Sequence, residues 1–130
     1  MEKTNKQEHE EVIVTAGKIV LPKIDVTQYI GKRLPIEKVT THKGQHGYYV
    51  KIASAIVDTI GNKDRPTELR ATRIIGLQED AQGNIGWGEG TAMDKYLTKM
   101  DVAHFTDLVG KEIVVQKRTA DTGAEFLTFD

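Results

Sequence analysis

The chain has 130 residues, no cysteine and a formal net charge of −1. A chain of this length builds one domain with one modest core, and the lack of cysteine excludes a disulfide framework and thiolate chemistry. No apolar run approaches the roughly 20 residues of a membrane span, and the charged N-terminus lacks the apolar core of a signal peptide, so we expect a cytoplasmic protein.

The near-neutral total conceals an uneven distribution of charge along the chain. Residues 32–73 contain nine Lys or Arg against four Asp or Glu, a balance of +5. Residues 79–130 contain five against ten, a balance of −5. Such a chain can present one basic face, although folding can also interleave the charges of the two halves.

The N-terminal region divides into two parts. Residues 1–11 are polar and charged without hydrophobic periodicity, so we expect a disordered tail there. Residues 12–21 hold two short apolar runs around Ala16 and Gly17 and end at Pro22. This segment is a candidate strand or hairpin whose role the sequence leaves open.

A short motif occurs twice in the chain. The first copy starts Tyr29-Ile-Gly-Lys and the second starts Leu108-Val-Gly-Lys, and both continue with alternating apolar residues. This pattern indicates a turn that needs glycine, followed by a strand with one buried face. We therefore expect both strands to be entered in the same way, with Pro35 at an edge or a bulge.

Three strand candidates cover residues 32–43, 48–58 and 68–79. A short glycine loop over residues 44–47 joins the first two as a hairpin, and a polar loop over residues 61–66 joins the second and third. Alternation in the second strand places Val50 and Ile52 on one face and Tyr49 and Lys51 on the other. If the first pair is buried, an aromatic ring and a cation face outward together.

The second half of the chain contains one helix and two strands. A turn over residues 80–84 leads to a glycine-rich segment over residues 85–90. Thr91 and Asp94 have the spacing of a capping box, which predicts a helix over residues 92–100 whose apolar stripe faces the core. Strands follow at residues 111–119 and 124–129, joined by a turn over residues 121–123.

Three strands, one helix and two strands form the plan of the five-stranded Greek-key barrel called the OB-fold. We therefore expect an all-β domain with one short helix over residues 12–130, with its core at about residues 29–129 and an N-terminal extension. An SH3-like barrel and an α+β sheet with one packed helix are the alternatives.

Four segments carry a resemblance to a known family: Tyr48-Tyr-Val-Lys-Ile52, Arg73-Ile-Ile-Gly-Leu77, Leu108-Val-Gly-Lys111 and Glu125-Phe-Leu-Thr-Phe129. Together they resemble OB-fold nucleic-acid-binding domains, similar to archaeal or viral single-strand-binding and replication protein A-like modules. The resemblance implies binding of single-stranded nucleic acid across the second and third strands, flanked by the loops at residues 44–47 and 121–123. The acidic second half departs from this pattern.

Candidate binding residues are the basic, histidine and aromatic side chains of the first three strands, the loops and the last hairpin. They are Lys38, His42, Lys43, His46, Tyr49, Lys51, Arg70, Arg73, Trp87, Lys117, Arg118 and Phe126. Cations neutralise phosphates and release counterions, and aromatic rings stack on any base. Alternation separates Arg70 from Arg73, so we expect only one of them on the surface. Trp87 is either a stacking platform or a plug that closes the barrel.

The sequence lacks the patterns of an enzyme or of a cofactor site. The segment at residues 86–90 has no Lys and Ser or Thr to hold phosphate and magnesium. Ser54, the only serine, lies in the middle of a strand, and the histidines His42 and His46 lack further metal ligands nearby. We expect a non-enzymatic protein without a metal or cofactor.

The leading hypothesis is a protein that binds single-stranded nucleic acid with little sequence preference, with DNA favoured over RNA. The alternative is an OB-fold protein–protein interaction module, or a subunit of a larger complex, that docks through its acidic second half. A third hypothesis is a small-molecule or oligosaccharide binder that uses the same groove and the glycine-rich segment at residues 85–90.

Overall fold

The computed structural model describes residues 13–15, 17, 25–61, 64 and 66–130. The tail predicted over residues 1–11 and most of the candidate strand at residues 12–21 lie outside the described residues. The described part is mostly β-structure with one short α-helix. Within it, no helix is long and apolar enough to cross a membrane.

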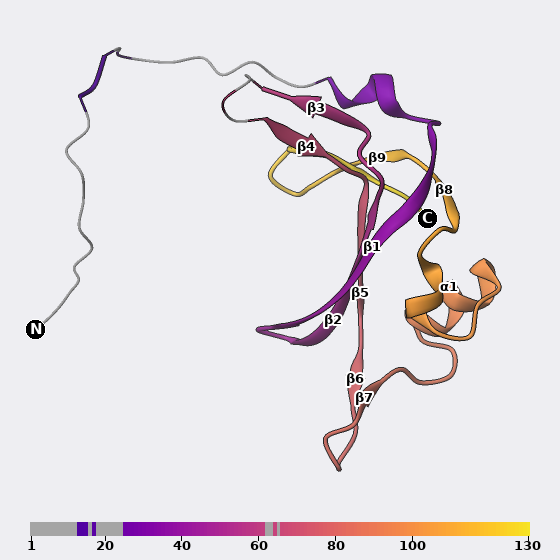
Figure 1. The fold of residues 1–130 in the computed structure, drawn as a ribbon. Helices are drawn as coiled ribbons and strands as arrows, with labels where there is room; N and C mark the ends of the chain where they lie inside the picture. Colours follow the sequence, from indigo (N-terminus) through magenta and orange to yellow (C-terminus); the bar gives the residue numbers. More distant parts are fainter. Residues whose placement is uncertain (1–12, 16, 18–24, 62–63, 65) are drawn as a thin grey trace, which may run out of the picture.

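The main sheet has four antiparallel strands and curls into a half-barrel (Figure 1). Its order is β5 (Thr72–Gly76), β2 (Gly47–Ser54), β1 (Arg33–Gly44) and β8 (Glu112–Val114). A register shift between Ile36 and Lys38 divides β1, so that its first residues pair with β8 and the rest with β2. A bulge bends a strand and increases its twist, and Pro35 lies directly before this one.

Three two-stranded hairpins complete the β-structure. β9 (Gln116–Thr119) pairs with β10 (Glu125–Thr128), β3 (Asp58–Ile60) with β4 (Thr67–Leu69), and β6 (Gln78–Glu79) with β7 (Ile85–Gly86). β10 also contacts β5. The β6–β7 hairpin continues β5 and projects beyond the sheet (Figure 1).

Three of the long predicted strands are broken. The one predicted over residues 48–58 ends at Ser54 and resumes as β3 at Asp58. The one predicted over residues 68–79 is interrupted at Arg70 and Ala71 and again at Leu77; Arg70 donates to Glu37 and to the Ser54 carbonyl. The one predicted over residues 111–119 is interrupted at Val115, whose amide donates to Lys32 O while its carbonyl accepts from Gly31 N. At Val115 the chain passes from the edge of β1 to the β9–β10 hairpin.

The helix α1 (Ala92–Met100) has the predicted bounds. Thr91 Oγ1 accepts from the Asp94 amide at 3.4 Å, and Asp94 Oδ2 accepts from the Gly90 amide at 2.8 Å. In a standard capping box the second bond comes from the amide of the N-cap residue itself. Here it comes from the amide of the residue before the N-cap, at the same end of the helix. The apolar stripe faces the core as expected, since Met93, Tyr96 and Leu97 are buried.

The repeated motif forms one symmetrical unit. A 3₁₀ turn, η2 (Val26–Tyr29) or η3 (Phe105–Leu108), precedes Gly31 or Gly110, and both glycines have φ +92°. The strands that follow pair with each other, with Leu34 opposite Ile113. The bonds are reciprocal, because Gly31 N donates to Val115 O and Gly110 N donates to Ile36 O. The expectation that both strands are entered alike is confirmed.

The core fills the inside of the curled sheet. Val50, Ile52, Met93, Leu108 and Phe129 are among its fully buried side chains. They come from β2, α1, η3 and the C-terminal end, so the core joins both halves of the chain. One face of the sheet is thereby used for packing, which leaves the other face of β1, β2 and β5 for a surface.

Candidate nucleic-acid interface

The outward-facing side chains of β1, β2 and β5 form a regular surface, which we call the ladder face. It consists of three rows of paired residues: Lys38, Ala53 and Thr72; Thr40, Lys51 and Ile74; His42, Tyr49 and Gly76. Ala53 is the one buried member. These positions alternate with buried Val50, Ile52 and Ile75, which confirms the predicted orientation of Tyr49 and Lys51. No carboxylate stands at any of the nine positions.

An aromatic stack lies at one end of the ladder face. The rings of His42 and Tyr49 are 5.2 Å apart and tilted by only 22°, and His42 Nε2 is 2.8 Å from Thr40 Oγ1. A Cβ at Gly44 would lie 3.2 Å from Tyr49 Cε1, tighter than most real contacts. Gly44 thus leaves room for the tyrosine ring, and the stack holds the ring in place before any ligand arrives.

Two lysines give the ladder face its charge. Lys38 and Lys51 are exposed, and neither forms an ion pair with any described residue. Lys51 lies opposite Ile74, which is 62 % exposed and is the most exposed large apolar side chain of the sheet. The sequence alone does not single out Ile74, because Ile74 and Ile75 are both apolar and the pattern does not say which one is outside.

A groove runs along the outer side of β5, and we call it the β5 groove. It consists of three hollows of about 360, 370 and 590 Å³. The hairpin hollow lies between the β1–β2 loop, Tyr49 and Ile74. The middle hollow shares Ile74 with it and adds Arg118 and Phe126.

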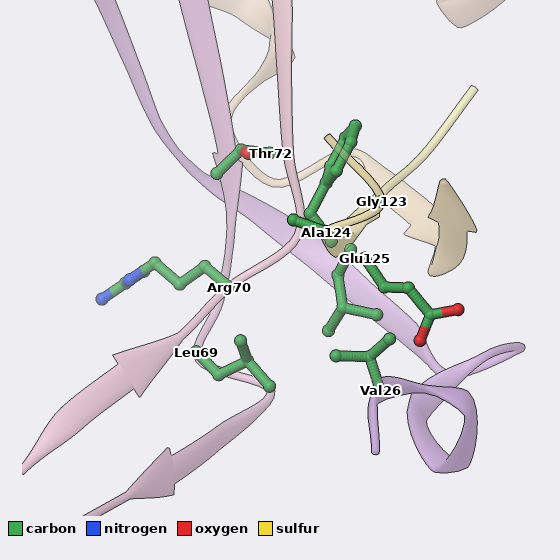
Figure 2. Close-up of a pocket in the computed structure, with 9 residues that line it drawn as sticks. Val26, Leu69, Arg70, Thr72, Gly123, Ala124 and Glu125 are labelled. Atoms are coloured by element: carbon green, nitrogen blue, oxygen red, sulfur yellow. The ribbon is translucent and has the colours of Figure 1, made fainter. Parts of the chain in front are cut away.

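The end hollow shares Thr72 and Phe126 with the middle hollow. It is lined by Val26, Leu69, Arg70, Thr72, Gly123, Ala124, Glu125, Phe126 and Leu127 (Figure 2). The groove therefore reaches from the loop of the first hairpin to the β9–β10 turn. These are the two loops between which the resemblance placed a nucleic acid.

Neither candidate arginine of the third strand belongs to the ladder face. The Arg70 side chain is 14 % exposed and bonds Glu37 at 2.8 Å, Ser54 O at 2.9 Å and Glu68 at 3.3 Å. The hydrogen bond that Arg70 donates to the Glu37 carboxylate raises the pKa of Arg70 above its usual value. Arg70 thus holds β4, β1 and β2 together and has little capacity left for a phosphate.

Arg73 lies on the opposite face of β5. Its guanidinium is 4.6 Å from the centroid of the Tyr96 ring on α1. Burial raises the pKa of Tyr96 to about 12, and its hydroxyl has no hydrogen-bond partner among the described residues. Arg73 also borders the middle hollow, so it reaches the groove from the side.

The remaining candidates fall into two groups. Near the groove, Lys43 lies 5.5 Å from the Tyr48 ring, His46 lies in the hairpin loop, and Phe126 is 43 % exposed. Lys117 and Arg118 are nearby but bond Glu125 at 3.0 Å and Asp130 at 3.2 Å.

Trp87 lies apart from the groove. It packs edge-on against His104 and Phe105, with ring centroids at 5.1 and 5.7 Å, and it contacts the core. This position favours the plug over the stacking platform. Within the described residues, no group of three His, Asp or Glu side chains could hold a metal ion.

Comparison with known proteins adds no precedent for this arrangement. No family model, no curated protein and no solved structure matches the chain.

Proposed function

We propose that this chain is an OB-fold protein that binds single-stranded nucleic acid, DNA in preference to RNA, across the ladder face and along the β5 groove. The binding has little sequence preference, because the surface offers stacking and charge and few fixed hydrogen-bond partners for base edges. The protein acts as a binding module and not as an enzyme.

The order of the strands supports the OB-fold. In that barrel the first strand pairs with the second and the fourth, and the last strand lies next to the third. Here β1 pairs with β2 and β8, and β10 contacts β5. The helix α1 comes between the third strand, β5, and the fourth, β8. The short hairpins β3–β4 and β6–β7 are additions to the five-stranded plan.

The ladder face is the observation that carries the binding proposal. It joins an aromatic ring held in position, two cations without an ion pair and an exposed apolar side chain, with no carboxylate among them. Phosphates are attracted by lysines that have no competing partner. Bases stack on a ring that is already oriented, so less conformational entropy is lost on binding.

The test is binding of a fluorescent oligothymidine of about 20–30 nucleotides, long enough for the range of OB-fold site sizes, at low and at moderate salt. We expect binding that weakens with salt. Tyr49→Ala should weaken it about 5- to 150-fold, the value of one stacked base, while Tyr49→Phe keeps the ring and most of the affinity. An oligouridine of equal length measures the preference for DNA.

Two results would contradict the proposal. The first is wild-type affinity in Tyr49→Ala, which would exclude the ladder face as the binding surface. The second is the absence of any binding at low salt, which would make the lysines incidental. The second result would favour the interaction module, whose partner should then be sought through the acidic second half.

A further inference from the structure

The end hollow is the largest cavity of the groove and differs from the other two in character. Most of its lining is apolar: Val26, Leu69, Ala124, Phe126 and Leu127. Its volume of about 590 Å³ falls within the range of roughly 300–1,000 Å³ that is typical of sites for small organic groups. The end hollow therefore has room for an aromatic group the size of a nucleobase.

Among the described residues that line the end hollow, none brings a free cation into it. Arg70 lines it, but its side chain extends away from the other labelled residues (Figure 2) and its guanidinium is bound to Glu37, Glu68 and the Ser54 carbonyl. Glu125 brings a carboxylate that bonds Lys117 at 3.0 Å. A phosphate would find no partner here, whereas an uncharged aromatic group would replace water against apolar side chains.

The end hollow adjoins the middle hollow, because the two share lining residues. Thr72 and Phe126 belong to both the end hollow and the middle hollow, and Thr72 also stands in the ladder face beside Ala53 and Lys38. A strand whose phosphates follow the lysines therefore has a base within reach of the hollow. An unstacked base is commonly held between aromatic and aliphatic side chains in this way.

We propose that the end hollow receives one unstacked base of the bound strand, next to the β9–β10 turn. This inference rests on the proposed function. It adds that the bases are not equivalent, because one leaves the stack and enters the hollow while the others lie on the ladder face.

A small residue of the β9–β10 turn, Ala124, leaves the end hollow unfilled. Gly123 has φ +89° and Ala124 follows it at the wall of the hollow. Ala124 is itself exposed to solvent, so a leucine there would extend into the hollow without disturbing a packed core. Ala124→Leu is the variant that fills the site, and Ala81→Leu in the exposed β6–β7 turn is the matched control.

The experiment uses short oligothymidines, cut to the length at which affinity first reaches its full value, about 4–16 nucleotides, so that the strand binds in one register; each carries one 2-aminopurine at a different position. The fluorescence of this base rises when it leaves the stack. With the wild-type chain we expect the rise at one position only. Ala124→Leu should abolish that rise and weaken binding about 5- to 150-fold, as expected for one lost base contact, with the same salt dependence. Ala81→Leu should behave as the wild type.

The outcomes separate this inference from the proposed function. Equal fluorescence at every position, or unchanged affinity in Ala124→Leu, would overturn the base site and leave nucleic-acid binding in place. The hollow would then suit an apolar side chain of a protein partner. Absence of any oligonucleotide binding by the wild type would overturn both. The wild-type scan does not depend on any variant, so a poorly folded Ala124→Leu would not block the test.

Discussion

Removing single lysines from the ladder face should change the salt dependence of binding in steps. Lys38 and Lys51 of the ladder face, and Lys43 beside the Tyr48 ring at the end of the groove, are exposed and form no ion pair among the described residues. Each phosphate contact on a single strand contributes a slope of about −0.7 to log K against log salt, so three contacts predict about −2.1. Lys51→Ala should then give about −1.4, and Lys38→Ala with Lys51→Ala about −0.7.

These slopes correspond to effects that are easily measured. Raising the salt from about 50 to about 200 mM should weaken wild-type binding about 20-fold and Lys51→Ala binding only about 7-fold. Fluorescence anisotropy of the labelled oligothymidine over a series of salt concentrations gives both values. The control is Lys95→Ala, an exposed lysine on α1 outside the ladder face and the groove.

Two results would refute this reasoning. One is a Lys51→Ala variant that loses the same factor of affinity at every salt concentration, because its lysine would then act through folding and not through phosphate. The other is a Lys95→Ala variant that lowers the slope as much as Lys51→Ala. That result would mean that charge anywhere on the protein matters equally.

Three further predictions concern stability and are measured by chemical or thermal unfolding. Tyr96→Phe should raise the free energy of unfolding by about 1 kcal/mol, because the buried hydroxyl has no partner among the described residues. The pKa of Tyr96 is about 12 in the folded chain and near 10 in the unfolded chain. The free energy of unfolding therefore keeps its full value below pH 10 and decreases as the pH rises towards 12. Tyr96→Phe should make this decrease smaller. Arg70→Ala should cost about 1–2 kcal/mol, since the Ser54 carbonyl loses its partner while the half-exposed Glu37 is solvated by water, without changing the salt slope of binding; a changed slope would place Arg70 in the interface. Gly31→Ala and Gly110→Ala should each cost about 1–2 kcal/mol, because both have φ +92°; clearly unequal costs would contradict the equivalence of the two motifs.

Local patterns in the sequence predicted the parts of the fold that depend on local chemistry. The helix at residues 92–100 was predicted with its correct bounds, because Thr91 and Asp94 mark its start and the apolar spacing marks its length. Alternation predicted that Val50 and Ile52 share one face and Tyr49 and Lys51 the other, and the structure shows that the first pair is buried and Lys51 exposed. The repeated glycine predicted the matching entries to β1 and β8, although their pairing with each other required the structure.

Features that depend on tertiary contacts could not be predicted from the sequence. At the break in the predicted third strand, Arg70 bonds Glu37, which is 33 residues earlier in the chain. The orientation of β5 is ambiguous in the sequence, since Ile74 and Ile75 fit either face equally well. For the site, the sequence suggested Tyr49 and Lys51, but not that Gly44 makes room for the tyrosine ring or that Ile74 completes the surface.

The contact between β5 and β10 has a consequence for the range of ligands. These two strands form opposite walls of the groove, yet in the described part of the chain no backbone hydrogen bond joins them. Side-chain packing sets the distance between the two walls, so the groove can become wider or narrower without breaking a backbone hydrogen bond. Under the proposed function, a groove of variable width would accept purines and pyrimidines alike, and a bound strand would bridge the two walls. The tolerance of many sequences that we propose would then follow from the packing of β5 against β10.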